Sequence, residues 1–150
     1  MTFSKKDIST SLSKEEVLSK IEKLTKPFSL KNTFNINKKE SHQFEGQFDD
    51  FSFTLFPLFD YGLNQLLRPK IVGQIETEDV HTVVQLEFHV PKNITYVLLL
   101  FVGLVIFIFT KTTIDIDKMM IFTAITMLVF YFGYSYKVNK SVQIIESELN

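Results

Sequence analysis

The sequence predicts an α+β membrane protein: an antiparallel β-meander with flanking amphipathic helices and a two-helix transmembrane hairpin. Two observations support this fold class. Two stretches in the last third of the chain, residues 94–110 and 119–136, contain no charged side chain. Before them, short segments of alternating apolar and polar residues are separated by turn-forming residues. A sheet and a membrane hairpin therefore account for most of the chain.

The two charge-free stretches approach the thickness of a bilayer. At about 1.5 Å per residue, each makes a helix of about 26 Å, against a hydrocarbon core of roughly 30 Å. The link between them, residues 111–118, carries four charged side chains, and placing one at mid-bilayer costs about 2.5–3.5 kcal/mol. The link is therefore a turn in water. A pair of buried core helices is the weaker alternative, because the 93 preceding residues could not enclose two helices that are apolar all round.

Side chains suited to a membrane interface gather at the end of the hairpin away from the link. Tyrosine prefers the headgroup level, and lysine extends its amine toward it. The predicted interface residues are Lys92, Tyr96, Tyr131, Tyr134, Tyr136 and Lys137. No apolar segment follows Lys5 and Lys6 as it would in a signal peptide. We therefore expect a multi-pass protein of the cell inner (cytoplasmic) membrane with both termini in the cytoplasm.

The N-terminal part of the chain divides at Ser13. Residues 1–12 are rich in serine, threonine and lysine, which predicts a disordered N-terminus. Ser13 and Glu16 form a capping-box pattern, and apolar residues then recur at helical spacing until Pro27. We expect an amphipathic helix over residues 14–26, at the start of a cytoplasmic α+β domain of residues 13–93.

The rest of this domain has the pattern of short strands. Five segments alternate between apolar and polar residues, at 34–37, 42–48, 51–55, 71–75 and 80–90. The last of them is the clearest, with its even-numbered residues facing the core. Short connections predict an antiparallel meander. A C-terminal amphipathic helix over residues 137–150, together with the helix at 14–26, is expected to pack on the apolar face of the sheet.

Three segments carry a resemblance to a known group of proteins. They are Phe44–Phe48 (Phe-Glu-Gly-Gln-Phe), Pro69–Ile75 (Pro-Lys-Ile-Val-Gly-Gln-Ile) and the run from Val80 to Phe109. With these segments the chain resembles a group of small two-helix membrane proteins common in Bacteroidetes. The resemblance implies the same sheet and hairpin. It implies no activity, since that group has no assigned chemistry.

Gly46 and Gly73 each lie inside a predicted strand, where glycine weakens the sheet unless a bend or a close approach requires it. Two explanations are open. Aromatic side chains of neighbouring strands lie across the glycines, or the glycines line a ligand groove. We favour the first.

The sequence contains no pattern typical of catalysis or metal binding. It lacks a nucleophile elbow, a phosphate loop, a dinucleotide fingerprint and a zinc-protease motif. His81, Glu87 and His89 share one strand face, but the two histidines lie about 26 Å apart along a strand. Cysteine chemistry is excluded because the chain has no cysteine. We predict no catalytic residue, no cofactor and no metal, and the net charge of −1 over residues 1–93 (12 basic and 13 acidic side chains) gives no surface for nucleic acid.

An apolar surface is predicted between residues 51 and 67 and the arginine that follows. Its candidate contact residues are Phe51, Phe53, Phe56, Phe59, Tyr61 and Arg68, the last suited to an anionic headgroup. Such a patch beside the lipid bilayer would meet lipid, an apolar ligand, a second copy of the chain or another protein. We expect a non-enzymatic, membrane-anchored module that mediates protein contacts or self-association. A module binding lipid or an apolar ligand is the alternative, and a membrane-associated enzyme comes third.

Overall fold

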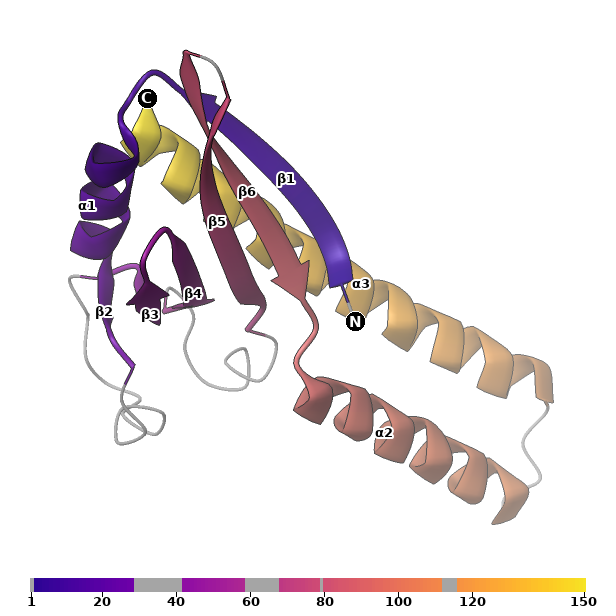
Figure 1. Cartoon of the computed structure of the whole chain (residues 1–150). Helices are drawn as coiled ribbons and strands as arrows, with labels where there is room; N and C mark the ends of the chain where they lie inside the picture. The colour runs from indigo at the N-terminus through magenta and orange to yellow at the C-terminus, as the bar shows by residue number, and fades with distance from the viewer. Residues whose placement is uncertain (1, 29–41, 59–67, 79, 112–115) are drawn as a thin grey trace.

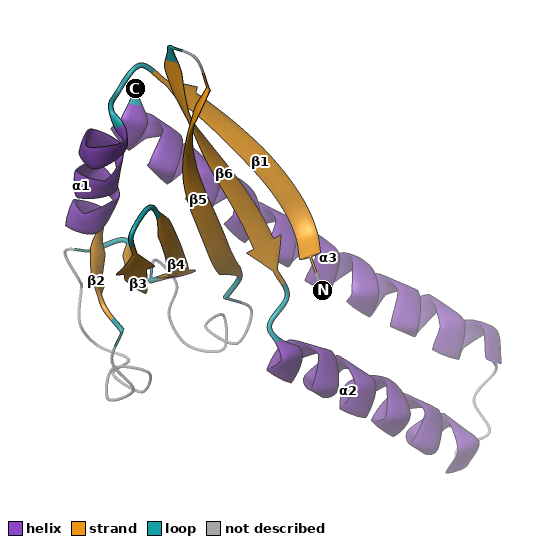
Figure 2. Ribbon diagram, in the orientation of Figure 1, coloured by secondary structure: helices purple, strands orange, loops and turns teal. Residues whose placement is uncertain are grey.

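The structure, a computed structural model, describes residues 2–28, 42–58, 68–78, 80–111 and 116–150. Six strands form one sheet, and three helices accompany it (Figure 1). Two of the helices run side by side away from the sheet as an antiparallel pair, α2 and the first part of α3 (Figures 1 and 2). The elements are β1 (Thr2–Thr10), α1 (Lys14–Leu24), β2 (Thr25–Pro27), β3 (Phe44–Asp49), β4 (Ser52–Pro57), β5 (Lys70–Glu78), β6 (His81–His89), α2 (Lys92–Lys111) and α3 (Ile116–Leu149).

The sheet has the strand order β1-β6-β5-β4-β3-β2. The four consecutive strands β3 to β6 form the antiparallel meander that the alternating pattern predicts. β1 adds to one edge, antiparallel to β6, and β2 adds to the other edge, parallel to β3. The sheet is therefore mixed rather than purely antiparallel. The strand predicted at 34–37 lies outside the described residues.

The prediction of a disordered N-terminus was wrong, because residues 2–10 form the edge strand β1. Most of its side chains are polar and face solvent, which is why composition alone suggested disorder. Ile8 is buried in the core, and Phe3 packs partly against it. β1 is ordered by pairing with β6, some eighty residues further along the chain, and no local sequence pattern predicts this pairing.

The helix predicted after Ser13 is confirmed, and it ends two residues earlier than expected. The Ser13 hydroxyl accepts a hydrogen bond from the Glu16 amide, and the Glu16 carboxylate accepts one from the Ser13 amide. These two bonds satisfy amides that have no partner inside the helix. The helix stops at Leu24 because Thr25 has extended backbone angles and begins β2. Val17 and Ile21 face the core.

The core lies between one face of the sheet and the helices α1 and α3, as predicted for the two amphipathic helices. The predicted inward face of β6 is confirmed at Val84, Leu86 and Phe88, which are fully buried. Val80 was placed on that face incorrectly. It precedes the strand and is 84% exposed, so the alternation holds only where β6 has neighbours on both sides.

The second apolar stretch and the C-terminal amphipathic helix are one continuous helix, α3, rather than two elements. Its 34 residues span about 51 Å. No glycine or proline interrupts the sequence at residue 137, where the separation was expected. The predicted C-terminal stripe does pack on the sheet, and all four of its members are buried: Val138, Val142, Ile145 and Leu149.

Candidate functional site

The apolar surface of the molecule is concentrated on α2 and the first half of α3. Among the described residues, nineteen large hydrophobic side chains are exposed, and sixteen of them belong to these two helical segments. A helix of a soluble domain instead exposes mainly its polar face. The sixteen are Tyr96, Leu99, Leu100, Leu104, Ile106, Phe107, Met120, Ile121, Phe122, Ile125, Met127, Leu128, Val129, Tyr131, Phe132 and Tyr136.

Among the described residues, one helical segment is long and apolar enough to cross a membrane, Met120–Leu149. Only 17% of its apolar stretch is buried. The apolar stretch of α2, Ile94–Phe107, is shorter than a full span. The structure thus contains one candidate span and one shorter apolar helix beside it.

The predicted interface residues divide into two groups. Tyr96, Tyr131 and Tyr136 are each more than half exposed, and Lys92 is exposed as well. Tyr134 and Lys137 are only 2% and 4% exposed, so their assignment to a lipid interface was wrong. The reason is the unbroken path of α3, which turns these two positions toward the sheet instead of ending at the headgroups.

Tyr134 joins α3 to the sheet. Its hydroxyl donates a hydrogen bond to the backbone oxygen of His89, the last residue of β6, at 2.8 Å. Its ring packs edge-on against Phe3 of β1, with centroids 4.7 Å apart. Ile94, at the start of α2, is buried in the same cluster. Both helices are thereby fixed to the end of the sheet at which β6 leads into α2.

The face of the sheet opposite α1 and α3 is uncovered among the described elements (Figures 1 and 2). The strand register places alternate residues of β4, β5 and β6 on it. They include Thr54, Phe56, Lys70, Gln74, Gln85, Glu87 and His89. This open face combines polar and aromatic groups, and its lower end in Figure 1 is the end from which α2 departs.

The aromatic residues predicted to form one contact surface are distributed over three environments. Phe53 is buried in the core, and Phe51 is 39% exposed with the Lys14 amine 5.2 Å from its ring centre. Phe56 lies on the open face beside Phe28. Phe59 and Tyr61 lie outside the described residues. Strand alternation, which sends neighbouring side chains to opposite faces, separates residues that are close in sequence.

Arg68 is held at the end of the sheet near α2. Its Nε donates a hydrogen bond of 2.7 Å to the backbone oxygen of Pro57, the last residue of β4. The side chain therefore connects the start of the β5 segment to the end of β4, which is a structural role that the sequence did not predict.

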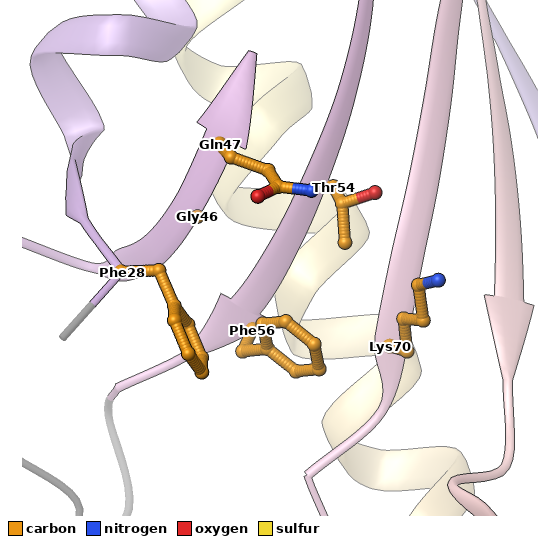
Figure 3. A pocket seen from close by; sticks show the side chains of 6 residues that line it. All are labelled: Phe28, Gly46, Gln47, Thr54, Phe56 and Lys70. Atoms are coloured by element: carbon orange, nitrogen blue, oxygen red, sulfur yellow. The ribbon is translucent and has the colours of Figure 1, made fainter. Parts of the chain in front are cut away.

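A groove of about 260 Å³ opens on this face (Figure 3). It is lined by Phe28, Gly46, Gln47, Thr54, Phe56 and Lys70. The rings of Phe28 and Phe56 lie side by side with centroids 5.8 Å apart, and Gln47 extends toward its register partner Thr54. A second groove of about 580 Å³ shares Phe28, Gly46 and Gln47 and continues past β2 to the end of α1.

Sequence reasoning identified only Phe56 and Gly46 among these groove residues. Phe28 was missed because Pro27 was interpreted simply as the end of a helix, whereas residues 25–27 pair with β3. Lys70 was treated as part of a strand pattern. The sequence alone did not show that Lys70 pairs with His89, at the end of the sheet from which α2 departs.

The two strand glycines have structural explanations. A Cβ at Gly73 would collide with the ring of Phe53, its register partner on β4. The prediction that an aromatic side chain lies across a glycine is therefore confirmed there. A Cβ at Gly46 would meet the Thr54 backbone oxygen and the Leu55 side chain. No aromatic side chain of the described residues lies across Gly46, so the first explanation does not apply there, and Gly46 lines both grooves.

Polar side chains of β6 and β1 contact one another across the strands. Glu87 pairs with Lys5 across the strands and with His89 Nε2 at 3.2 Å. The hydrogen bond from Lys5 holds the pKa of Glu87 below its ordinary value, and the same bond raises the pKa of Lys5. His81 lies at the opposite end of β6. Within the described ranges, no three histidine or acidic side chains come together as a metal site would require.

Comparison with protein-family models, curated proteins and solved structures gave no match. The resemblance to the Bacteroidetes group stays a prediction, and the chemistry of the surfaces described above is the basis for a functional assignment.

Proposed function

We propose that this chain is a non-enzymatic, membrane-anchored α+β module, in which α2 and the first half of α3 insert into the bilayer as a hairpin. The sheet is then held at the membrane surface for contact with a second copy or another protein. One observation carries the proposal: sixteen of the nineteen exposed large hydrophobic side chains among the described residues belong to these two helices. Contiguous apolar patches on soluble monomers rarely exceed a few hundred Å², and lipid is the solvent that such a surface requires.

The distribution of charge supports the hairpin rather than a single span. Neither 94–110 nor 119–136 contains an ionisable acid or base that would oppose insertion. The four charges of residues 111–118 then lie in water on the far side. α2 is short for a span on its own, and a short helix is accommodated by local thinning of the bilayer or by drawing the flanking domain into the headgroup region.

The attachment of the hairpin leaves the sheet little freedom. Only Val90 and Pro91 separate β6 from α2, and α3 enters the core without a break. The membrane-proximal end of the sheet would therefore lie against the headgroups. There the open face would present Lys70, His89 and Thr2 near the lipid surface.

Topology is tested with single cysteines at Ser4, Thr113 and Ser147, since the chain has no cysteine of its own. Labelling of intact cells with an impermeant maleimide is expected at position 113 alone. Permeabilised cells, in which Ser4→Cys and Ser147→Cys also react, provide the control. Labelling of intact cells at position 4 or 147 would overturn the cytoplasmic placement, and release of the wild-type protein by alkaline carbonate would overturn the membrane anchor itself.

Self-association is tested separately by crosslinking in intact membranes. A dimer that persists when expression is lowered supports contact between copies. A strictly monomeric protein with no crosslinked partner contradicts the contact function while leaving the anchor intact.

The second candidate function, binding of a lipid or an apolar ligand, is favoured by the groove beside Phe28 and Phe56. It involves the open face rather than the whole segment 51–67, because Phe53 faces the core.

A further inference from the structure

The groove on the open face has the composition of a site for a molecule with an apolar part and a negative charge. Phe28 and Phe56 provide an apolar wall, with ring planes inclined at 48°. Lys70 is the only charged side chain that lines the smaller groove among the described residues. An amphipathic anion matches this combination of an apolar wall and a positive charge. A cation would be repelled by the Lys70 amine, and a purely apolar ligand would make no use of its charge.

The polar groups of the groove are available to a ligand. None of the side-chain hydrogen bonds or ion pairs found among the described residues involves Lys70, and the amine is exposed to solvent. Gln47 and Thr54 contribute an amide and a hydroxyl on the neighbouring strands (Figure 3). An anionic oxygen placed near Lys70 would receive a charge-assisted hydrogen bond, which is the stronger class of such bonds.

The position of the groove indicates where the ligand comes from. Lys70 is the register partner of His89, and α2 begins three residues after His89. Phe56 follows Leu55, the partner of Ile71, so it lies at the same end of β4. The groove thus opens at the end of the sheet that the proposed hairpin holds against the bilayer, and a lipid of that leaflet is the nearest amphipathic anion.

We infer that this groove binds a membrane lipid with an anionic headgroup, with the headgroup at Lys70 and the first part of the chain against the wall formed by Phe28 and Phe56. A volume of about 260 Å³ is below the roughly 300–1,000 Å³ of sites that enclose a whole drug-sized ligand. The groove therefore takes the headgroup end of the lipid. The second groove, which shares Phe28, Gly46 and Gln47 with the first, offers room for more of the chain. The inference rests on the proposed membrane anchor for its source of ligand.

The test uses the full chain in detergent micelles, titrated with oleoyl lysophosphatidic acid and, as the neutral match, monooleoylglycerol, and followed by native mass spectrometry. The wild type is expected to bind one lysophosphatidic acid saturably and monooleoylglycerol more weakly. Lys70→Gln is expected to weaken the anionic probe about tenfold and leave the neutral probe unchanged, as the loss of one hydrogen bond to a charged group predicts. Phe56→Ser is expected to weaken both.

Lys6→Gln is the matched control, because Lys6 is an exposed strand lysine on β1, away from the groove. It is expected to bind both probes as the wild type does. Equal binding of the anionic probe by wild type and Lys70→Gln, or equal binding of the two probes by wild type, would overturn the inference. Excess inorganic phosphate that displaces the lipid completely would also overturn it, since the site would then recognise a free anion.

Carbonate extraction of the same variants separates this inference from the proposed function. All variants are expected to stay in the membrane, because Lys70 and Phe56 lie outside the hairpin. If they stay while the anionic probe fails to bind, the lipid site alone is wrong. If the wild type is extracted, the anchor is wrong, whatever the probes show.

Discussion

The two halves of α3 form a single helix in two environments. From Met120 to Phe132 the helix exposes apolar side chains and contains no charge. From Tyr134 to Leu149 it buries one apolar stripe against the sheet and exposes polar residues such as Asn139 and Gln143. No break in the helix marks the change. The comparison shows that helix formation and the burial of apolar side chains are set by separate features of the sequence.

The two halves of α3 also differ in the elements that they contact. In the first half, α3 has α2 beside it, with the rings of Phe101 and Phe122 6.5 Å apart. In the second half it contacts strands and α1, and the Lys20 amine donates a hydrogen bond to the Glu148 backbone oxygen at 2.6 Å. Stability of the sheet should therefore depend on the second half of α3 far more than on the first.

The largest effect is expected from truncating isoleucine in each half. Ile145 is completely buried and Ile125 is 54% exposed. Ile145→Ala should cost about 3 kcal/mol, since it removes buried methyl groups and leaves a cavity. Ile125→Ala should change the stability of the sheet by less than about 0.5 kcal/mol. Amide hydrogen exchange of β5 and β6 peptides in micelles measures both, and equal losses of protection would contradict the division of α3.

A smaller effect is expected at Tyr134, where the two halves meet. Tyr134→Phe removes the hydroxyl that donates to the His89 backbone oxygen and keeps the ring in the core. A loss of about 1 kcal/mol is expected for one neutral hydrogen bond. Tyr136→Phe is the control, because Tyr136 is 62% exposed. Thermal unfolding in detergent compares the two variants, and indistinguishable midpoints would mean that the Tyr134 bond does not help to fix the helix to the sheet.

The smallest effect is expected at acid pH, where α1 and α2 should respond differently. Hydrogen bonds from the Ser13 backbone and hydroxyl to the Glu16 carboxylate lower the pKa of Glu16 from 4.5. Its stabilising contribution is therefore complete above that value and is lost as pH falls through the lower folded-state pKa. Between about pH 5 and 3, protection of α1 should decline less steeply in Glu16→Gln than in wild type. Protection of α2, which has no acid between Ile94 and Thr110, serves as the internal control.

Local patterns in the sequence predicted much of the fold. The capping box located α1, and alternation located β3 to β6 with the correct inward face at Phe88 and Leu86. What failed were features that depend on distant partners. β1 is mostly polar and is ordered by pairing with β6 and by contacts with α3, and β2 is three residues long.

The candidate site was less predictable for the same reason. Phe53 and Phe56 belong to one aromatic segment, and only the direction of each side chain decides that one enters the core and the other lines the groove. The groove further requires Phe28 and Lys70, which β2 and β5 bring together across two intervening strands. A single sequence contains the alternation but not the register that joins these positions.

The hydrogen bond from the Thr10 hydroxyl to the backbone oxygen of Leu149, 3.0 Å long, links positions 139 residues apart. It implies an order of events during biosynthesis. The strands leave the ribosome before the half of α3 that covers them, and α2 and the apolar half of α3 emerge in between. If α2 and the first half of α3 insert as proposed, they reach the bilayer before the core is complete, and until then the sheet has a bare apolar face that is prone to aggregation. A chain that ends at residue 136 would lack the half of α3 that covers the sheet.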